Sequence, residues 1–319
     1  MENIAFINDH FINSNTNFNE LVAELKRAFS NSSVEVPLRH HHDFPNPNEN
    51  IESTLLLMPA WNPGKNAGVK IVTVSPNNGK YNLPSIQGTY IYLDAQTGIV
   101  KAILEAKALT TKRTASASAL ASSYLSNPNS SSLLMIGTGA LSTNLILAHA
   151  SVRPLKKVFV WGRNFEKATK VCKELADEKF EISAIQTIEE IISEVDIISC
   201  ATLSKEPLVL GKYLKKGQHI DLVGAYKKDM RESDDEAIQK SSVFVDTYQS
   251  GLKESGDIVI PIQNGIISKD EIKADLFELC SEKKQGRQNQ EEITLFKSVG
   301  HALEDLAAAS YYYQKYKNE

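Results

Sequence analysis

Cysteine is scarce in this chain of 319 residues. Its three cysteines, Cys172, Cys200 and Cys280, lie far apart, and no two of them form a CxxC pair. The sequence therefore offers neither a disulfide framework nor paired thiolates for zinc.

Three consecutive histidines, at 40–42, cannot all face one ion from a strand or a helix, so we expect solvated or supporting side chains there. We predict no metal site, buried free thiols and a reducing, cytoplasmic location.

An excess of basic charge is also missing. The chain has 35 Lys and Arg against 39 Asp and Glu, a net charge of -4, which argues against nucleic acid as a partner. No apolar run approaches the roughly 18–20 residues that cross a bilayer. The first residues, MENIAFINDHF, have neither the basic start nor the apolar core of a secretory signal. We therefore expect a protein that binds neither nucleic acid nor membranes.

The composition, 42% hydrophobic and 23% charged residues, is typical of a globular protein, and the length suits two domains. In the first third, residues 17–30 place apolar side chains on one helical stripe. Strand-like runs follow, with the turn DAQTG between the last two, and they predict an antiparallel sheet. These runs are residues 53–59, 68–74, 89–94 and 99–105.

The pattern changes after residue 110. A helix rich in Ala and Ser is expected at 114–125, and apolar strands then alternate with amphipathic helices, which predicts βαβ crossovers and a parallel sheet. We expect strands at 133–136, 158–161, 182–186, 197–201, 219–223 and 243–246, and helices at 141–151, 164–178 and 188–193. Residues 291–317 read as a helix that returns to the first domain. The predicted domains are 1–115 plus 297–319, which would bind substrate and dimerise, and 116–296, which would bind a nucleotide.

A glycine turn follows the first of these strands. Gly137 and Gly139 come directly after the apolar run 133–136, and a helical pattern begins near Leu141. Gly137 would allow a tight turn, Gly139 would let a pyrophosphate approach the backbone, and the helix would offer free N–H groups. The third glycine of the dinucleotide fingerprint is replaced by Ser142. We interpret the turn as a loosened dinucleotide site; the alternative is a strand–helix turn without a ligand.

The end of the next strand predicts which dinucleotide binds. An NAD site usually has Asp or Glu there for the ribose 2′-hydroxyl, but this chain continues with Gly162, Arg163 and Asn164. The planar guanidinium of Arg163 could pair with a 2′-phosphate. We therefore favour NADPH over NADH; the alternative is a surface arginine that covers the strand end.

Several segments together resemble the ornithine cyclodeaminase/mu-crystallin family over nearly the whole chain. They are PLR at 37–39, GVKIVTV at 68–74, LPSIQG at 83–88, LTTKRTA at 109–115, the turn at Gly137, DLVGA at 221–225, FKSVG at 296–300 and EDL at 304–306. The resemblance implies an α/β fold in which a Rossmann-type doubly wound sheet is inserted in a smaller α+β domain. It also implies homodimers that pair through the outer domain, and hydride transfer to or from the α-carbon of a small amino or imino acid.

The resemblance also suggests site residues. Arg39 and Arg113 would bind the substrate carboxylate, a role that suits a charged, bidentate group, although a lone arginine is often only a surface ion pair. Lys70 lies in an apolar strand, where burial would lower its pKa and suit it to bind substrate and transfer a proton. The alternative is an edge-strand lysine that faces water. The cofactor would contact Arg113, Thr114, Gly137, Thr138, Gly139, Ala140, Leu141, Arg163, Asn164, Ala201, Thr202, Leu203, Val223, Ser298 and Gly300.

One departure from the family pattern bears on the reaction. Members that cyclise ornithine carry an aspartate just after the segment 223–225, where this chain has Tyr226, Lys227 and Lys228. A phenol with a pKa of about 10 does not replace a carboxylate at neutral pH, and two lysines would repel the ammonium of ornithine. We therefore predict NAD(P)H-dependent reduction of a small cyclic imino acid, such as Δ1-pyrroline-2-carboxylate, to L-proline. The alternatives are an ornithine cyclodeaminase, an alanine or N-alkyl amino-acid dehydrogenase, and a non-catalytic NADPH-dependent binding protein like mu-crystallin.

Overall fold

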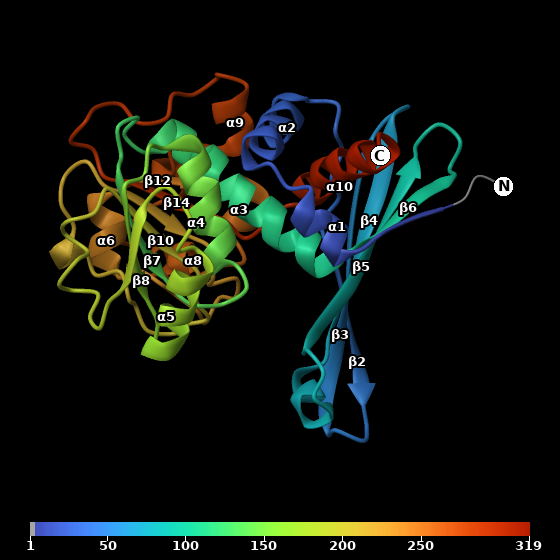
Figure 1. Cartoon of the computed structure of the whole chain (residues 1–319), viewed down its shortest axis with the longest axis horizontal. Coiled ribbons are helices and arrows are strands. Elements are labelled where there is room, and N and C mark those ends of the chain that lie inside the picture. Colours follow the sequence, from blue (N-terminus) through green and yellow to red (C-terminus); the bar gives the residue numbers. More distant parts are fainter. Residues whose placement is uncertain (1–3) are drawn as a thin grey trace. The chain divides into compact units, whose positions relative to one another are not determined.

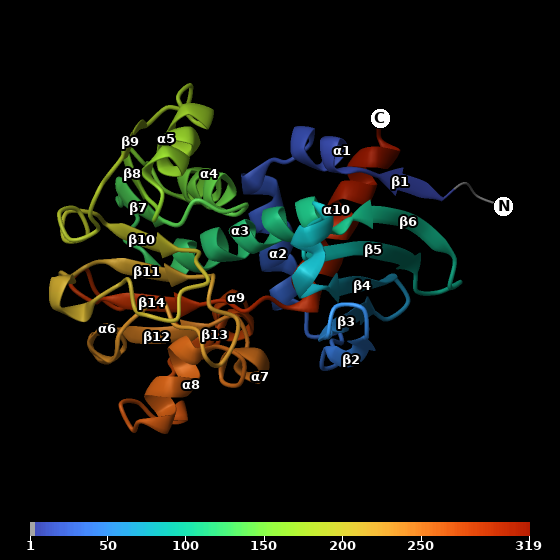
Figure 2. The ribbon, with the colours of Figure 1, turned by 90° about the horizontal axis from the view of Figure 1, so that it is seen from below.

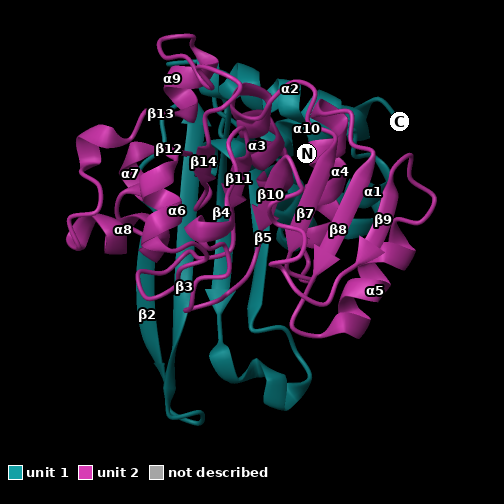
Figure 3. Ribbon diagram, turned by 90° about the vertical axis from the view of Figure 1, so that its left-hand side faces the viewer, with its two compact units in different colours: residues 1–113, 302–319 teal, residues 114–301 magenta. Residues whose placement is uncertain are grey.

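The computed structural model describes residues 4–319, and these residues form two compact units (Figure 3). Unit 1 contains the described residues up to Arg113 together with Ala302–Glu319, and unit 2 contains Thr114–His301. Unit 2 is therefore inserted in the sequence of unit 1. The sequence predicts such an insertion, because it places the C-terminal segment in the first domain.

Unit 1 is a six-stranded sheet with helices on one face. Its strands are β1 (Ala5–Ile7), β2 (His40–Asn46), β3 (Ile51–Asn62), β4 (Asn66–Val74), β5 (Ile86–Asp94) and β6 (Val100–Glu105), in the spatial order β1-β6-β5-β4-β3-β2 (Figure 2). Its helices are α1 (Asp9–Ser14), α2 (Phe18–Ser30), α10 (Ala302–Lys317) and the short 3-10 helix η1 (Pro76–Tyr81). All neighbours pair antiparallel except β1 and β6, which are parallel, so the predicted antiparallel sheet is confirmed.

Helix α10 packs against β3, β4 and β5 and against α2 (Figure 1). The predicted apolar stripe of α2 is buried at Leu21, Leu25 and Phe29, and the Asn17 side chain caps this helix by accepting the N–H of Glu20. Because side chains alternate along a strand, one face of the sheet turns toward α10 and the other turns away from it. The face toward α10 carries the site described below.

Unit 2 is an eight-stranded parallel sheet. Its strands are β7 (Ser132–Ile136), β8 (Lys157–Trp161), β9 (Glu181–Ala184), β10 (Ile197–Cys200), β11 (His219–Leu222), β12 (Ser242–Val245), β13 (Ala274–Asp275) and β14 (Thr294–Lys297). Their order is β13-β12-β14-β11-β10-β7-β8-β9 (Figure 2), and every neighbouring pair is parallel. The strand order reverses between β7 and β10, which is the arrangement of a doubly wound nucleotide-binding sheet.

Helices connect these strands, as crossovers between parallel strands require. They are α4 (Ser142–Val152), α5 (Phe165–Glu174), α6 (Asp235–Lys240), α7 (Tyr248–Gly251), α8 (Gly256–Gln263), α9 (Leu276–Cys280) and the 3-10 helices η2 (Gly211–Tyr213) and η3 (Lys269–Glu271). Helix α3 (Ala106–Leu125) leads from β6 to β7, the first strand of this sheet in the sequence. The central strands are buried on both faces because both faces are covered; one face of β10 and β11 is apolar, and the other carries the buried polar residues Ser199, His219 and Asp221. The predicted α/β fold, a doubly wound sheet inserted in a smaller α+β unit, is thus confirmed.

Two predicted helices are wrong. Residues 188–193 form turns: Ile188 and Ile192 are buried, and their packing is compatible with turns as well as with a helix, so their helical spacing does not decide the local structure. Residues 291–317 are not one helix, because they begin with the buried strand β14 and Gly300 then adopts a φ of 84°, a left-handed conformation that separates the strand from α10. Smaller differences lie at helix ends: α5 stops at Glu174, and α3 begins at Ala106.

The three cysteines are free; Cys200 and Cys280 are buried and Cys172 is half-buried. Among the helices described within residues 4–319, none combines the length and the apolar character that a membrane span requires.

Candidate active site

Lys70 lies in the middle of β4, with β3 on one side and β5 on the other. Only 3% of its surface is exposed, and its side chain turns toward α10. The alternative interpretation, a lysine on an edge strand that faces water, is therefore wrong. A buried ammonium group requires a partner, because burial without one costs several kcal/mol.

The partner is Asp305, in the first turn of α10. The Lys70 Nζ lies 2.9 Å from Oδ1 and 2.8 Å from Oδ2 of this carboxylate. Arg113 donates from Nε to Asp305 Oδ1 at 2.9 Å and from Nη1 to Glu304 Oε2 at 2.7 Å. These four residues, all buried, are called the charged cluster below. Its two cations and two carboxylates balance in charge, which allows them to be buried together.

The charged cluster changes the titration of Lys70. Burial lowers the pKa of Lys70 to about 8, although the negative charge of Asp305 opposes this shift; the positive charges of Arg113 and Arg39 add to it. Burial alone would raise the pKa of Asp305, but Lys70 and Arg113 hold it below its ordinary value. Near neutral pH, the pair therefore consists of a carboxylate and an ammonium group that can release its proton.

Tyr90 lies opposite Lys70 on β5 and is fully buried. Its ring lies over Gly68, where a Cβ atom would come within 2.2 Å of the Tyr90 hydroxyl oxygen. A side chain at position 68 would therefore displace the ring. Burial raises the pKa of Tyr90 well above its ordinary value, so the phenol stays protonated beside the charged cluster.

Arg39 precedes β2 and is half-buried. It belongs to unit 1, as Lys70 and Arg113 do, and its charge acts on Lys70. The histidines at 40–42 form the start of β2 and are exposed. Within residues 4–319, no three His, Cys, Asp or Glu side chains gather as a metal site would require.

In unit 2, the glycine turn joins β7 to α4. Gly137 has a φ of 119° and donates its N–H to the Trp161 carbonyl at 2.8 Å, and a Cβ atom here would lie 2.6 Å from the Ala201 carbonyl oxygen. Only glycine fits this position. Ser142, which replaces the third glycine, has its Oγ 2.9 Å from the Gly137 carbonyl and 3.0 Å from that of Gly139. Its hydroxyl thus holds the turn in place.

The geometry of this turn fits a dinucleotide. Gly139 is exposed, and a Cβ atom there would meet nothing within 4 Å. Among the described residues, the N–H groups of Thr138, Gly139, Ala140 and Leu141 donate no backbone hydrogen bond, and α4 has no side-chain cap. A pyrophosphate could therefore approach the backbone and accept these N–H groups.

The other predicted cofactor residues follow the carboxyl ends of neighbouring strands. Ala201, Thr202 and Leu203 come after β10, Val223 after β11, Ser298 and Gly300 after β14, and Arg163 and Asn164 after β8. A doubly wound sheet binds its ligand at this edge, beside the point where the strand order reverses. Arg163 is exposed and forms no ion pair with any residue in 4–319. Asn164 caps α5 by accepting the N–H of Lys167, and Thr114 is buried in α3.

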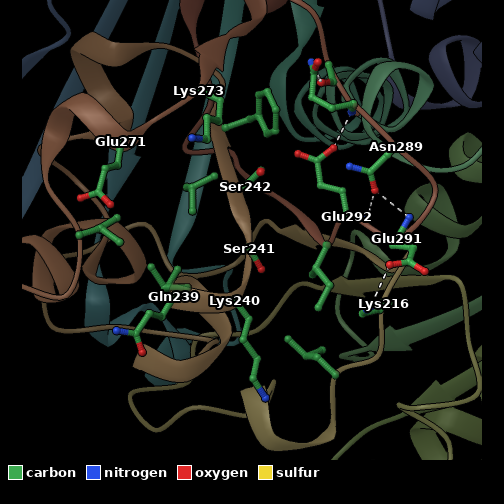
Figure 4. Close-up of a pocket in the computed structure, with 18 of the residues that line it drawn as sticks. Lys216, Gln239, Lys240, Ser241, Ser242, Glu271, Lys273, Asn289, Glu291 and Glu292 are labelled. Atoms are coloured by element: carbon green, nitrogen blue, oxygen red, sulfur yellow. Dashed lines mark hydrogen bonds and ion pairs between the residues drawn. The ribbon is translucent and has the colours of Figure 1, made fainter.

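A pocket of about 1040 Å³ lies elsewhere in unit 2 (Figure 4). Its walls include Ser242, Ile293 and Lys273, which stand at or just before the amino ends of β12, β14 and β13. It therefore opens at the opposite edge of the sheet from the glycine turn and is not the cofactor site.

Sequence reasoning did not assign roles to the acids that complete these sites. Glu304 and Asp305 enter the sequence analysis only as part of the family motif EDL, and no local pattern predicts Glu232, which binds the loops after β10 and β11. Two adjacent carboxylates in the otherwise apolar stretch after Gly300 are the signal that could have indicated buried partners for Lys70 and Arg113.

Comparison with known proteins identifies the family of this chain. The sequence model of the ornithine cyclodeaminase/mu-crystallin family matches residues 4–319. The chain belongs to this family. The resemblance predicted from the motifs is thereby confirmed.

Several similar proteins are named as enzymes. A Δ1-pyrroline-2-carboxylate reductase of Colwellia psychrerythraea is 40% identical over 93% of this chain and 95% of its own length. The structure of the Thermococcus litoralis Δ1-pyrroline-2-carboxylate reductase in complex with NADH and L-proline is 33% identical, with a TM-score of 0.91 over 99% of this chain and 98% of that one. An archaeal alanine dehydrogenase dimer with bound NAD is 28% identical, with a TM-score of 0.89 over 99% and 97%.

Proposed function

We propose that the protein reduces Δ1-pyrroline-2-carboxylate, or a close cyclic homologue, to L-proline or the corresponding cyclic L-amino acid with a nicotinamide cofactor. The observation that carries the proposal is the buried Lys70–Asp305 pair, a proton donor held beside the cations Arg113 and Arg39. The activities of the Colwellia and Thermococcus relatives support the choice of substrate. The balanced reaction consumes the imine, one reduced cofactor and one proton.

Each residue of the proposed substrate site has a distinct task. Arg113 uses two of its five N–H donors on Glu304 and Asp305, which leaves three for a substrate carboxylate. Since the charged cluster is neutral overall, Arg39 would provide the additional positive charge. Lys70 would give its proton to the imine nitrogen and make the adjacent carbon electrophilic. The bound cofactor would supply the hydride that this carbon accepts.

For the cofactor, we propose that the turn from Gly137 to Leu141 holds the pyrophosphate and that Arg163 binds a 2′-phosphate, so that NADPH is preferred over NADH. The free, exposed guanidinium of Arg163 and the lack of a carboxylate after β8 support this preference.

The proposal is tested by giving the purified protein Δ1-pyrroline-2-carboxylate with NADPH or NADH and following the loss of reduced-cofactor absorbance. We expect L-proline as the product and a KM at least about tenfold lower for NADPH, since an arginine–phosphate pair is a strong charge-assisted interaction. Arg163→Gln should abolish this preference, whereas Lys170→Gln on α5 should keep it. Oxidation of alanine or release of ammonia from ornithine, without imine reduction, would contradict the proposed function, as would cofactor binding without turnover.

We also propose a homodimer that forms through unit 1. The sheet face turned away from α10 carries apolar side chains such as Leu57, Ile71 and Ile91, each partly exposed. An apolar sheet face of this kind is typical of a subunit interface. The dimer of the archaeal alanine dehydrogenase supports the proposal.

Light scattering should give about twice the chain mass of 35.3 kDa, and Ile71→Glu should halve the measured mass; a wild-type mass of one chain would contradict the dimer.

A further inference from the structure

A second buried set of charges lies in unit 2. It consists of Glu232, Asp257 and Lys297, each with no exposed surface, and is called the anchor cluster below. Lys297 ends β14, and its Nζ lies 3.1 Å from Asp257 Oδ2 and 3.7 Å from Glu232 Oε2. Asp257 Oδ1 in turn accepts the backbone N–H of Glu232 at 2.7 Å. Asp257 therefore fixes the backbone of Glu232, and Lys297 places a positive charge near its carboxylate.

The Glu232 carboxylate connects two loops. Its Oε1 accepts the N–H of Thr202 at 2.6 Å and the hydroxyl of the same residue at 2.9 Å. Its Oε2 accepts the N–H groups of Gly224 at 2.7 Å and Ala225 at 3.2 Å. All four neighbours are donors, so the ionised carboxylate, which only accepts, is the form that fits. One side chain thus satisfies N–H groups that the sheet itself leaves without partners.

Both loops belong to the edge of the sheet where the cofactor is proposed to bind. Thr202 follows β10, next to the point at which the strand order reverses, and Gly224 follows β11. The loops touch each other, because a Cβ atom at Gly224 would lie 1.9 Å from the Thr202 carbonyl oxygen. Their backbones can be this close because position 224 is glycine.

We propose that Glu232 is a positioning residue for the nicotinamide cofactor. It would not touch the cofactor; by tying Thr202 to Gly224 and Ala225, it would set the shape of the crevice that receives the dinucleotide. This inference rests on the proposed function, since it assumes that a dinucleotide binds at this edge. Glutamine cannot replace the carboxylate, because its amide NH₂ would face the N–H groups of one of the two loops.

The test is the dissociation constant of NADPH, measured by calorimetry on the full chain without any imine. Glu232→Gln should raise this constant about 10- to 100-fold, because small displacements of binding groups are costly. Glu232→Asp, which keeps the charge, should recover part of the affinity and remains measurable if the glutamine variant does not fold. With NADPH saturating, the KM for the imine should stay within about twofold of wild type, because the substrate residues lie in unit 1.

Asp196 provides a matched control. Its Oδ2 accepts the N–H groups of Ser131 at 2.7 Å and Ser132 at 3.0 Å, so it ties together the amino ends of β7 and β10, at the other edge of the same sheet. Asp196→Asn should lower the melting temperature while leaving NADPH affinity unchanged.

Wild-type affinity in a folded Glu232 variant would overturn the inference, as would an equal loss of affinity in Asp196→Asn. If the wild-type protein binds NADPH but reduces no imine, and Glu232→Gln weakens that binding, the proposed function is contradicted and the role of Glu232 is supported.

Discussion

Lys70→Met should lower kcat for imine reduction by about 10²- to 10⁴-fold, the usual contribution of a positioned proton donor. Methionine has a similar length and packs well in apolar surroundings, so the side chain should fit its place in β4. Asp305 would keep Arg113 as a partner, which limits the loss of stability. The NADPH dissociation constant should stay at its wild-type value.

The pH dependence tests the same role. Because the reaction needs protonated Lys70, and the pKa of this residue is about 8, wild-type kcat/KM should fall as the pH rises through about 8. The residual activity of Lys70→Met should lack this decline. Lys65→Met, at an exposed turn of the same unit, is the control and should keep both the rate and the profile. A Lys70→Met enzyme as fast as wild type would remove Lys70 from the mechanism.

Asp305→Asn should shift the alkaline decline of activity to lower pH. The negative charge of Asp305 raises the pKa of Lys70, so its removal leaves burial and the neighbouring arginines to lower that pKa further. At pH 7, a larger share of Lys70 would be neutral, and kcat should fall. The variant should also lose about 3–5 kcal/mol of unfolding free energy, because two buried cations lose their common partner.

Glu304→Gln is the matched control for Asp305→Asn. It also removes a carboxylate bound to Arg113, but the ammonium of Lys70 is bonded to Asp305. We expect it to destabilise the fold and to leave the alkaline decline near pH 8. The kcat/KM profile from pH 6 to 10 and urea unfolding measure the two effects. If both variants shift the decline equally, the pKa of Lys70 does not depend specifically on Asp305.

The parts of the fold that sequence reasoning predicted are those with local signals. The strand–turn–helix at Gly137 is encoded within about ten residues, and α2 is marked by its apolar stripe. The errors arose where local patterns are ambiguous: β14 is only four residues long and has two apolar residues, Leu295 and Phe296, and Ile188 and Ile192 have helical spacing in a turn. In such places tertiary packing decides the structure.

The candidate site also contains some residues that the sequence predicts and others that it does not. Lys70 could be predicted mainly because the segment GVKIVTV resembles the family motif, and the cost of burying a charge in an apolar strand supports the prediction. The partner of Lys70 could not be predicted, because Asp305 lies 235 residues further along the chain and no local pattern pairs the two residues. Glu232 is harder still, because its neighbours are backbone N–H groups, which leave no trace in side-chain identity.

The insertion of unit 2 between Arg113 and Ala302 also affects the order in which the two units can fold while the chain is being synthesised. A ribosome that adds about 5–20 residues per second needs roughly 10–50 s to pass from Lys70 to Asp305. During that interval the nascent chain carries Lys70, and from position 113 on also Arg113, without the carboxylates that neutralise them, while all of unit 2 is synthesised. Unit 2 can thus fold first, and unit 1 must wait for α10 before its core can close. Chaperones that hold the early strands would act during this delay.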